Sequence, residues 1–306
     1  MSADLFEEII ELPDPAVKRR YDELVGLDNE KLILLKQTRL LLNPSLLAKW
    51  SNEKYGKEIN LLKSFRKKPP LFIFSGDVGT GKTSLAETFG DAIAREENIS
   101  ATVYRISLKT RGNGTVGDMT KMISGAFDTL IGEAKKSPIK DKKPKNAIVL
   151  IIDEADALAQ SRESAQMHHE DRAGVNALIR GIDNVSSEHL PVIVIMCTNR
   201  LSSVDPAVKR RASMIFNFTR PNDTQRKTIF ENALGDTDIT KDQIKKLIQA
   251  TGPIHFDYGY TYSDLLQKFL PNILIEFFPD EAIDFNKVIE LAKETIPTPP
   301  FKNNDE

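Results

Sequence analysis

One eight-residue segment constrains the fold of this chain more than any other. It reads Gly-Asp-Val-Gly-Thr-Gly-Lys-Thr at positions 76–83, after a short apolar run at 71–74 and before a helical pattern that contains Leu85 and Phe89. A strand, a glycine-rich loop and a helix in this order are typical of phosphate-binding loops. The glycines let backbone N–H groups approach phosphate oxygens, and the positive end of the helix dipole favours an anion. The segment therefore predicts a nucleoside-triphosphate site.

The loop also assigns tasks to its side chains. We expect Lys82 to reach the β- and γ-phosphates and the Thr83 hydroxyl to bind Mg²⁺, so ATP and Mg²⁺ are the expected cofactors. The residues expected to hold the nucleotide here are Gly76, Asp77, Val78, Gly79, Thr80, Gly81, Lys82, Thr83 and Ser84.

Further apolar runs at 147–152 and 192–197 have polar neighbours at both ends, as strands buried on both faces do. Helical repeats lie between them, which predicts an α/β fold with a parallel sheet, the αβα sandwich of P-loop nucleotide hydrolases. After position 222 the pattern is helical, and Thr240 with Gln243 suits a capping box. We expect an N-terminal segment at 1–20, a large α/β domain at 21–221, a small helical lid at 222–296 and a tail at 297–306 that frays.

Composition narrows the class of protein. The chain has 306 residues, 40% hydrophobic and 28% charged, with a net charge of −2. This mixture argues against wholesale disorder and against a basic protein that coats nucleic acid. The single cysteine, Cys197, excludes an intrachain disulfide and a four-cysteine zinc site.

With no visible secretory signal or membrane span, we expect a cytoplasmic protein without a membrane partner. Six lysines between 135 and 145 predict a solvated loop, because no aromatic residue lies among them to stack on bases.

Acidic and amide side chains follow the two later strands. Asp153 and Glu154 come directly after 147–152, and Asn199 follows 192–197. Open α/β sheets bind ligands at the carboxyl ends of their strands. We expect Asp153 to hold Mg²⁺, Glu154 to polarise the attacking water, and Asn199 to hydrogen-bond that water and the γ-phosphate. In isolation the acidic pair also suits a helix N-cap and Asn199 a turn; beside a phosphate loop the catalytic interpretation is favoured.

With these motifs in this order, the chain resembles the AAA+ ATPases over roughly residues 20 to 270. The match includes 24–27, similar to the segment that lines the adenine pocket in that family, so Gly26 and Leu27 are expected at the nucleotide. It also includes 205–211, similar to the arginine-finger segment. The resemblance implies a ring of identical subunits, a hexamer, in which Arg210 or Arg211 reaches the neighbour's nucleotide. Arg211 is favoured, because its Arg-Ala-Ser context resembles that of the finger in the subgroup described next.

Within that family, 172–178, the finger context and 263–271 look most like the pachytene-checkpoint class. That resemblance implies an ATP-driven remodeller that partially unfolds a HORMA-domain protein; compact bacterial members accompany cyclic-oligonucleotide synthases in antiphage operons. The lid of the class carries an arginine that senses nucleotide, whereas the matching stretch here offers Lys268. Lysine presents a point charge without a planar fork.

Two polar segments occupy the places of the family's pore loops. They are expected to contact the protein substrate through Asn113, Thr115, Val116, Gly117, His168 and His169. The stretch 112–117 also fits a dinucleotide-binding GxGxxG pattern, but no acidic strand end follows at the required distance. A zinc site at the histidines lacks the second histidine of HExxH, since Ala173 stands there.

The sequence thus predicts an ATP-hydrolysing protein remodeller with a HORMA-domain-type partner. The alternative is a DNA-associated AAA+ ATPase, a loader or initiator that uses ATP as a switch. That alternative needs a basic surface that follows nucleic acid, which the near-neutral composition does not favour. Stimulation of ATP turnover by a HORMA-domain protein or by DNA distinguishes the two.

Overall fold

The computed structural model describes residues 5–65, 68–108, 118–137, 139–140, 143–158, 169–253 and 258–301. The chain forms two compact units. The first unit comprises Met1–Glu23, Asn29–Ser75 and Thr83–Asn217; the second comprises Leu24–Asp28, Gly76–Lys82 and Phe218–Glu306.

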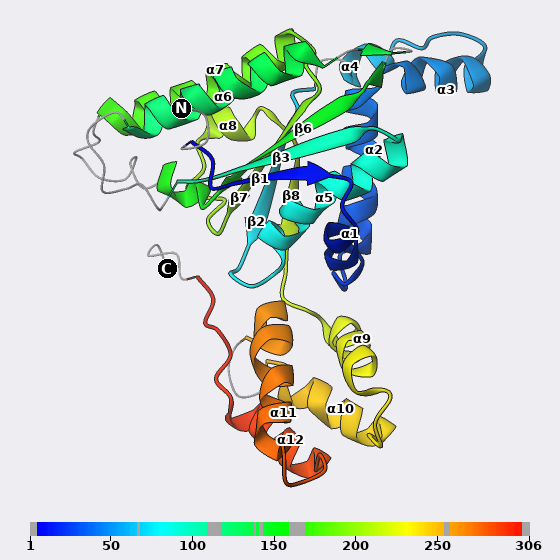
Figure 1. The fold of residues 1–306 in the computed structure, drawn as a ribbon, viewed down its shortest axis with the longest axis vertical. Coiled ribbons are helices and arrows are strands. Elements are labelled where there is room, and N and C mark those ends of the chain that lie inside the picture. Colours follow the sequence, from blue (N-terminus) through cyan, green and yellow to red (C-terminus); the bar gives the residue numbers. More distant parts are fainter. Residues whose placement is uncertain are drawn as a thin grey trace. The chain divides into compact units, whose positions relative to one another are not determined.

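The first unit is built on a six-stranded sheet of order β1-β3-β6-β7-β2-β8 (Figure 1). Strands β3, β6, β7 and β2 run parallel, while β1 pairs with β3 in the antiparallel sense. The continuous apolar runs of β6 and β7 are buried along almost their whole length, as expected for strands covered on both faces. The strands are β1 (Glu8–Leu12), β2 (Leu71–Gly76), β3 (Ser100–Ser107), β6 (Asn146–Asp153), β7 (Val192–Thr198) and β8 (Ala212–Phe218).

Helices cover both faces of this sheet (Figure 1). One face packs on α6 (Asp118–Lys136) and α7 (His169–Ser187), which bury Leu130 and Leu178 against Ile148 and Leu150 of β6. The other face packs on α5 (Lys82–Glu97), where Gly90 lies so close to Val103 and Val149 that a Cβ would meet them at 2.7 and 3.9 Å. The remaining helical segments of this part are α1 (Pro15–Asp22), α2 (Asp28–Leu42), α3 (Ser45–Tyr55), α4 (Leu62–Phe65), the 3₁₀ turn η1 (Ala155–Leu158) and α8 (Pro206–Lys209).

The predicted α/β class and its parallel strands are confirmed, and two edge strands were missed. β1 lies in the segment set apart at 1–20, where Glu-Ile-Ile-Glu-Leu gives a weak alternation. β8 is partly exposed along its length and so lacks a continuous apolar run. Part of the lysine-rich segment predicted as a loop forms a two-residue ladder between β4 (Ile139–Lys140) and β5 (Lys143–Pro144).

The second unit adds a helical bundle after β8. Both capping boxes in it are complete: Thr240 with Gln243, as predicted, and Asn222 with Gln225. Its core includes Phe230, Leu247, Tyr260 and Phe269, all nearly inaccessible to solvent. Its helices are α9 (Asp223–Leu234), α10 (Lys241–Ala250), the π-helical segment η2 (Asp264–Phe269), α11 (Leu270–Phe277) and α12 (Phe285–Glu294).

Candidate active site

The phosphate-binding loop has the backbone that its glycines predict. Gly76, Gly79 and Gly81 have φ values of 151°, 75° and 93°, which side chains with a Cβ rarely adopt. At Gly76 a Cβ would lie 2.0 Å from the carbonyl oxygen of Phe218, so glycine is required there for packing as well. The loop ends at Lys82, the first residue of α5, so its N–H groups lie at a helix N-terminus.

Lys82 is turned toward the loop itself. Its Nζ donates to the carbonyl oxygens of Gly76 at 2.8 Å and Asp77 at 2.6 Å, and the residue is only 6% exposed. Thr80 closes the same turn, because its Oγ1 donates to the carbonyl of Asp77 at 2.7 Å. These contacts hold the ammonium group beside the loop, where a phosphate oxygen is a stronger acceptor than a carbonyl oxygen.

Gly26 and Leu27, predicted to line the base pocket, lie in the same unit as the loop. Leu27 is buried, and a Cβ on Gly81 would lie 3.4 Å from its Cδ1. Gly26 has a φ of 74°, and its carbonyl accepts from Nε2 of Gln225 at 2.9 Å. Gln225 was not among the predicted site residues, although its place in a capping box identifies it as an ordered side chain.

The predicted Mg²⁺ ligands Thr83 and Asp153 are neighbours in the first unit. Thr83 Oγ1 lies 3.4 Å from Asp153 Oδ1, at the end of β6. A hydroxyl and a carboxylate are the hard oxygen donors that Mg²⁺ prefers, and it commonly takes only one or two protein ligands beside phosphates and water. The two side chains therefore fit a magnesium ion.

Arg105 on β3 is a charged neighbour that the sequence analysis missed. Its Nη2 lies 3.3 Å from Asp153 Oδ2, its Nη1 lies 2.6 Å from Glu87 Oε1, and its Nε lies 3.8 Å from Glu7 Oε2. Burial raises the pKa of the Glu87 carboxyl, and Arg105 opposes that rise. The cation is thus shared among three carboxylates. The antiparallel strand β1, absent from the prediction, brings Glu7 alongside it.

Glu154 follows Asp153 in an uncommon backbone conformation. Its φ is 52°, and its N–H donates to Asp153 Oδ1 at 2.9 Å. Its Oε2 accepts from Ser107 Oγ at 2.8 Å; Ser107 ends the neighbouring strand β3. Left-handed backbone in a residue with a Cβ is found mostly where the surroundings enforce it, often at functional sites. The parallel register of β3 and β6 places this serine beside the predicted base.

Asn199 is held by a residue that the sequence analysis did not single out. Asp156 accepts from the backbone N–H of Asn199 at 2.9 Å, from its Nδ2 at 3.1 Å and from the N–H of Arg200 at 3.2 Å. The Thr198 hydroxyl also donates to Asp156. Because an ionised carboxylate only accepts, the NH₂ end of the Asn199 amide must face it. The amide oxygen of Asn199 therefore points away from Asp156.

The two candidate finger arginines differ in their surroundings. Arg211 forms a bidentate pair with Asp183, with Nε–Oδ1 at 2.8 Å and Nη2–Oδ2 at 2.9 Å, and this hydrogen bonding raises its pKa. Arg210 is exposed at the C-cap of α8. From the sequence, Arg211 was the favoured finger. Nothing in the sequence indicated that Arg211 would pair with Asp183, which lies 28 residues earlier.

The remaining predicted residues lie elsewhere or outside the described part of the chain. Lys268 Nζ contacts Asp264 Oδ1 at 2.8 Å and Thr298 Oγ1 at 3.0 Å. Val78 and Ser84 lie in the loop and in the first turn of α5. Asn113, Thr115, Val116, Gly117 and His168 are outside the described residues, and His169 begins α7, with its side chain not described.

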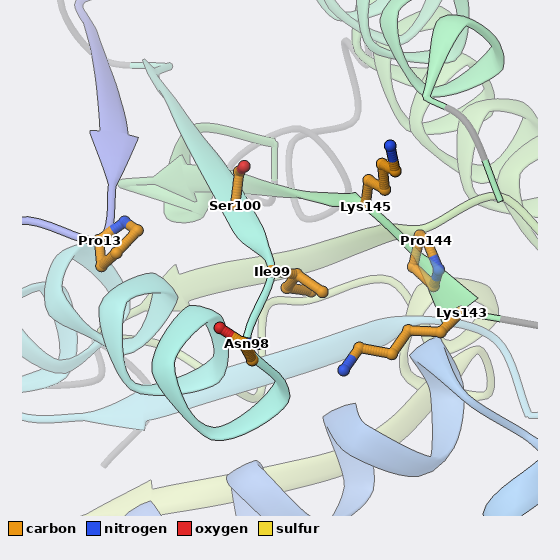
Figure 2. A pocket seen from close by; sticks show the side chains of 7 residues that line it. All are labelled: Pro13, Asn98, Ile99, Ser100, Lys143, Pro144 and Lys145. Carbon is orange, nitrogen blue, oxygen red and sulfur yellow. The ribbon is translucent and has the colours of Figure 1, made fainter. Parts of the chain in front are cut away.

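A hollow of about 720 Å³ lies at the starts of strands β3 and β6, the ends opposite to Ser107 and Asp153 (Figure 2). It is lined by the starts of β3 and β6, with Ser100 and Lys145, and by Asn98 and Lys143. Asp153 and Ser107 end these same strands. The hollow is therefore separate from the acidic edge, and Lys143 in it is already bonded to Glu97.

Comparisons with known proteins place the chain in a family. Residues 72–220 match the model of the ATPase family associated with various cellular activities (AAA). CD-NTase-associated protein 6 of Escherichia coli strain MS 115-1 is 45% identical over 299 residues, which are 97% of this chain and 96% of that protein.

Two solved structures are similar over nearly the whole chain. A chain of the E. coli MS115-1 HORMA:CdnC:Trip13 complex has 44% identity and a TM-score of 0.92, with 99% of both chains covered. The Rhizobiales Trip13 structure has 40% identity and a TM-score of 0.76, with 96% of this chain and 100% of that chain covered.

These matches confirm the resemblance that the motifs indicated. In the described part of the chain, no helix is both long enough and apolar enough to span a membrane. The phosphate loop, the acidic strand end and the whole-length similarity agree, and the chain belongs to the AAA ATPase family, as a nucleotide-binding ATPase of the Trip13-like type.

Proposed function

We propose that this protein works in the bacterial cytoplasm as a ring of identical subunits, a hexamer. In this proposal ATP hydrolysis partially unfolds or disassembles a HORMA-domain protein in antiphage signalling. The observation that carries it is the match over 99% of both chains to a protein that forms a complex with HORMA and CdnC. The likeness extends over nearly the whole chain, so the proposal concerns the chain as a whole and not one part of it.

The loop and the helix that follows it support ATP binding. Backbone N–H groups between Gly76 and Lys82 surround the phosphates, and Lys82 exchanges its two carbonyl partners for β- and γ-phosphate oxygens. Leu27 and Gly26 line the base in this proposal. Thr83 and Asp153 would hold Mg²⁺, which neutralises charge on the phosphates when bound.

Hydrolysis needs a water molecule aligned with the γ-phosphate. Glu154 is the general base that accepts a proton from this water. To act, its carboxylate gives up the hydrogen bond from the Ser107 hydroxyl and accepts one from the water instead. Asn199 presents its amide oxygen to the water, because Asp156 holds the NH₂ end. A second hydrogen on Nδ2 remains for a γ-phosphate oxygen.

Completion of the site requires a neighbouring subunit. Arg210 is exposed and able to reach outward, whereas Arg211 must first leave Asp183. An arginine donated by a second protein is worth about 10³ to 10⁵ in rate in related phosphoryl transfers. We therefore propose Arg210 and Arg211 as the finger candidates and Lys268 as a lid cation. The proposed substrate contacts are Asn113, Thr115, Val116, Gly117, His168 and His169.

The function is tested by ATP turnover with two added partners. A HORMA-domain protein from the same bacterium should stimulate turnover, and DNA should not; the reverse result would support a loader or initiator. Lys82→Ala is the matched control, expected to lose binding of a fluorescent ATP analogue. Unchanged affinity in that variant would remove the phosphate-loop role.

Mixed subunits test the shared site. Arg210→Ala and Arg211→Ala subunits are each combined with Glu154→Gln subunits, so that a complete finger and a complete base meet only across an interface. Partial recovery of turnover for one arginine identifies it as the finger. Failure of both mixtures, with assembly confirmed by light scattering, would contradict a finger supplied in trans.

A further inference from the structure

A carboxylate stands inside the loop that is proposed to bind a triphosphate. Asp77 is the second residue of the segment, directly between Gly76 and Val78. A carboxylate and a phosphate close together repel each other, and the repulsion is stronger where water is partly excluded. An unpaired Asp77 would therefore weaken the binding of a polyanion to its own loop.

The structure supplies a compensating cation for Asp77 within the same unit. Arg220 Nε lies 2.9 Å from Asp77 Oδ2, and the two side chains are 14% and 27% exposed. The other carboxylate oxygen, Oδ1, accepts from the backbone N–H of Phe301 at 3.2 Å. Both oxygens of Asp77 are thus engaged by donors, one of them charged.

Arg220 is also held in place by neutral groups, which leave its positive charge unpaired with any further carboxylate in the described part of the chain. Its Nη1 donates to the carbonyl oxygens of Gly259 at 2.6 Å and Thr298 at 2.8 Å. Its guanidinium carbon lies 5.0 Å from the centre of the Tyr258 ring, a cation–π contact. In the described part of the chain, the ion pair found for Arg220 is the one with Asp77. The positive charge is thereby held for a single carboxylate.

We propose that Arg220 is a positioning residue for nucleotide binding, which neutralises Asp77 and so allows the phosphate loop to accept ATP. The inference rests on the proposed function of the loop. Arg220 does not need to touch the nucleotide, because it acts through Asp77. The C-terminal residues Thr298 and Phe301 assist by holding Arg220 and Asp77 in register.

The proposal predicts a specific pattern of nucleotide affinity. Removing Arg220 leaves an uncompensated negative charge in the loop, and we expect ATP to bind about tenfold more weakly. Removing the charge of Asp77 as well should cancel that loss. Because the effect is electrostatic and partly exposed to solvent, it should shrink as ionic strength rises.

The experiment measures binding of a fluorescent ATP analogue with Mg²⁺ to the full-length protein. The variants are Arg220→Ala, Asp77→Asn and the double variant, with Lys246→Ala as the control. Lys246 pairs with Asp242 at 2.9 Å on an exposed surface of the same unit. We expect the wild-type affinity in the control, about a tenfold loss in Arg220→Ala, and recovery to within about twofold in the double variant.

Other outcomes overturn the proposal. A double variant as weak as Arg220→Ala would show that the arginine serves only the packing of its unit. Wild-type affinity in Arg220→Ala would show that Asp77 needs no neutralisation. If Arg220→Ala does not fold, Arg220→Lys, which keeps the charge, decides instead: it must bind within about threefold of wild type. A wild-type protein that binds no ATP would refute the proposed function itself, which is a distinct result.

Discussion

The proposed function gives a part in triphosphate binding to two aspartates, Asp153 in the first unit and Asp77 in the second, and each is paired with a different arginine. The arginine next to Asp153, Arg105, also contacts Glu87 and Glu7, so one positive charge is divided among three carboxylates. The arginine next to Asp77, Arg220, is otherwise held by carbonyl oxygens and a ring. In the proposed function, Asp153 therefore keeps negative charge for a metal ion, whereas Asp77 is neutralised by its own arginine. The same residue type is given opposite electrostatic roles by its partners.

The largest expected effect concerns Glu154, whose N–H is bonded to Asp153. Glu154→Gln removes the carboxylate that we propose as the general base and keeps the shape of the side chain. We expect kcat to fall by about 10² to 10⁴ while ATP affinity stays within a few-fold of wild type. Single-turnover hydrolysis beside equilibrium binding checks this. Near-normal turnover would take the base role away from Glu154.

The next prediction compares the same substitution at the two aspartates, Asp153 and Asp77. Asp153→Asn removes the charge of a proposed Mg²⁺ ligand, so Mg²⁺ should bind more weakly, and we expect the half-saturating Mg²⁺ concentration for ATP turnover to rise at least about tenfold. Asp77→Asn should leave the Mg²⁺ dependence unchanged and hold ATP at least as tightly. Magnesium titrations at saturating ATP compare them. Equal shifts in both variants would mean that the two carboxylates have the same role.

Asp156 should have a smaller effect, because it acts through Asn199. Without its carboxylate, the amide of Asn199 loses its fixed orientation, and we expect kcat to fall about tenfold in Asp156→Ala with little change in KM for ATP. In an Asn199→Ala background the same substitution should cost almost nothing further. Additive losses in the double variant, or a matching rise in KM, would indicate a general structural role instead.

The sequence predicted what depends on local pattern and missed what depends on pairing across the fold. The loop glycines, the strand ending in Asp153 and Glu154 and the capping box at Thr240 are set by residues close together in the chain. Arg105 and Arg220 carry no local signature, since an arginine in a strand or after one is common. Their roles arise when β3 meets β6, and when Arg220 meets a loop residue 143 positions away.

Edge strands and chain ends were missed for a related reason. β1 exposes three of its five side chains to solvent and so lacks the continuous apolar run that identified β6 and β7. The tail was expected to fray from position 297, yet Thr298 and Phe301 are hydrogen-bonded to charged groups that only the folded chain supplies. The pairing of Arg211 with Asp183 was likewise invisible, so the preference between the two finger candidates rested on context alone.

The smallest expected effect concerns the tail, where two truncations are matched. Removal of 298–306 deletes the carbonyl that holds Arg220 and the N–H that binds Asp77; removal of 302–306 keeps both. We expect ATP affinity to fall about two- to threefold in the first and to stay unchanged in the second. Equal affinities would show that Arg220 neutralises Asp77 without help from the tail.

The pH dependence of the free energy of unfolding tests separately whether Thr298 acts on the Asp264 carboxylate or only packs the tail. Burial acts to raise the pKa of Asp264, but hydrogen bonds from Lys268, Thr298 and Thr261 outweigh it and hold that pKa well below its usual range. A carboxyl with a lowered pKa in the folded state stabilises the fold above its unfolded pKa of about 4, and the contribution disappears as the pH falls. The longer truncation removes two of these hydrogen bonds, so its free energy of unfolding should drop by about 2 kcal/mol at pH 7, and this drop should shrink as the pH falls through the lowered pKa of Asp264 in the fold. A drop that stays constant in denaturant titrations from pH 7 to below that pKa would mean that Thr298 does not act through the Asp264 charge.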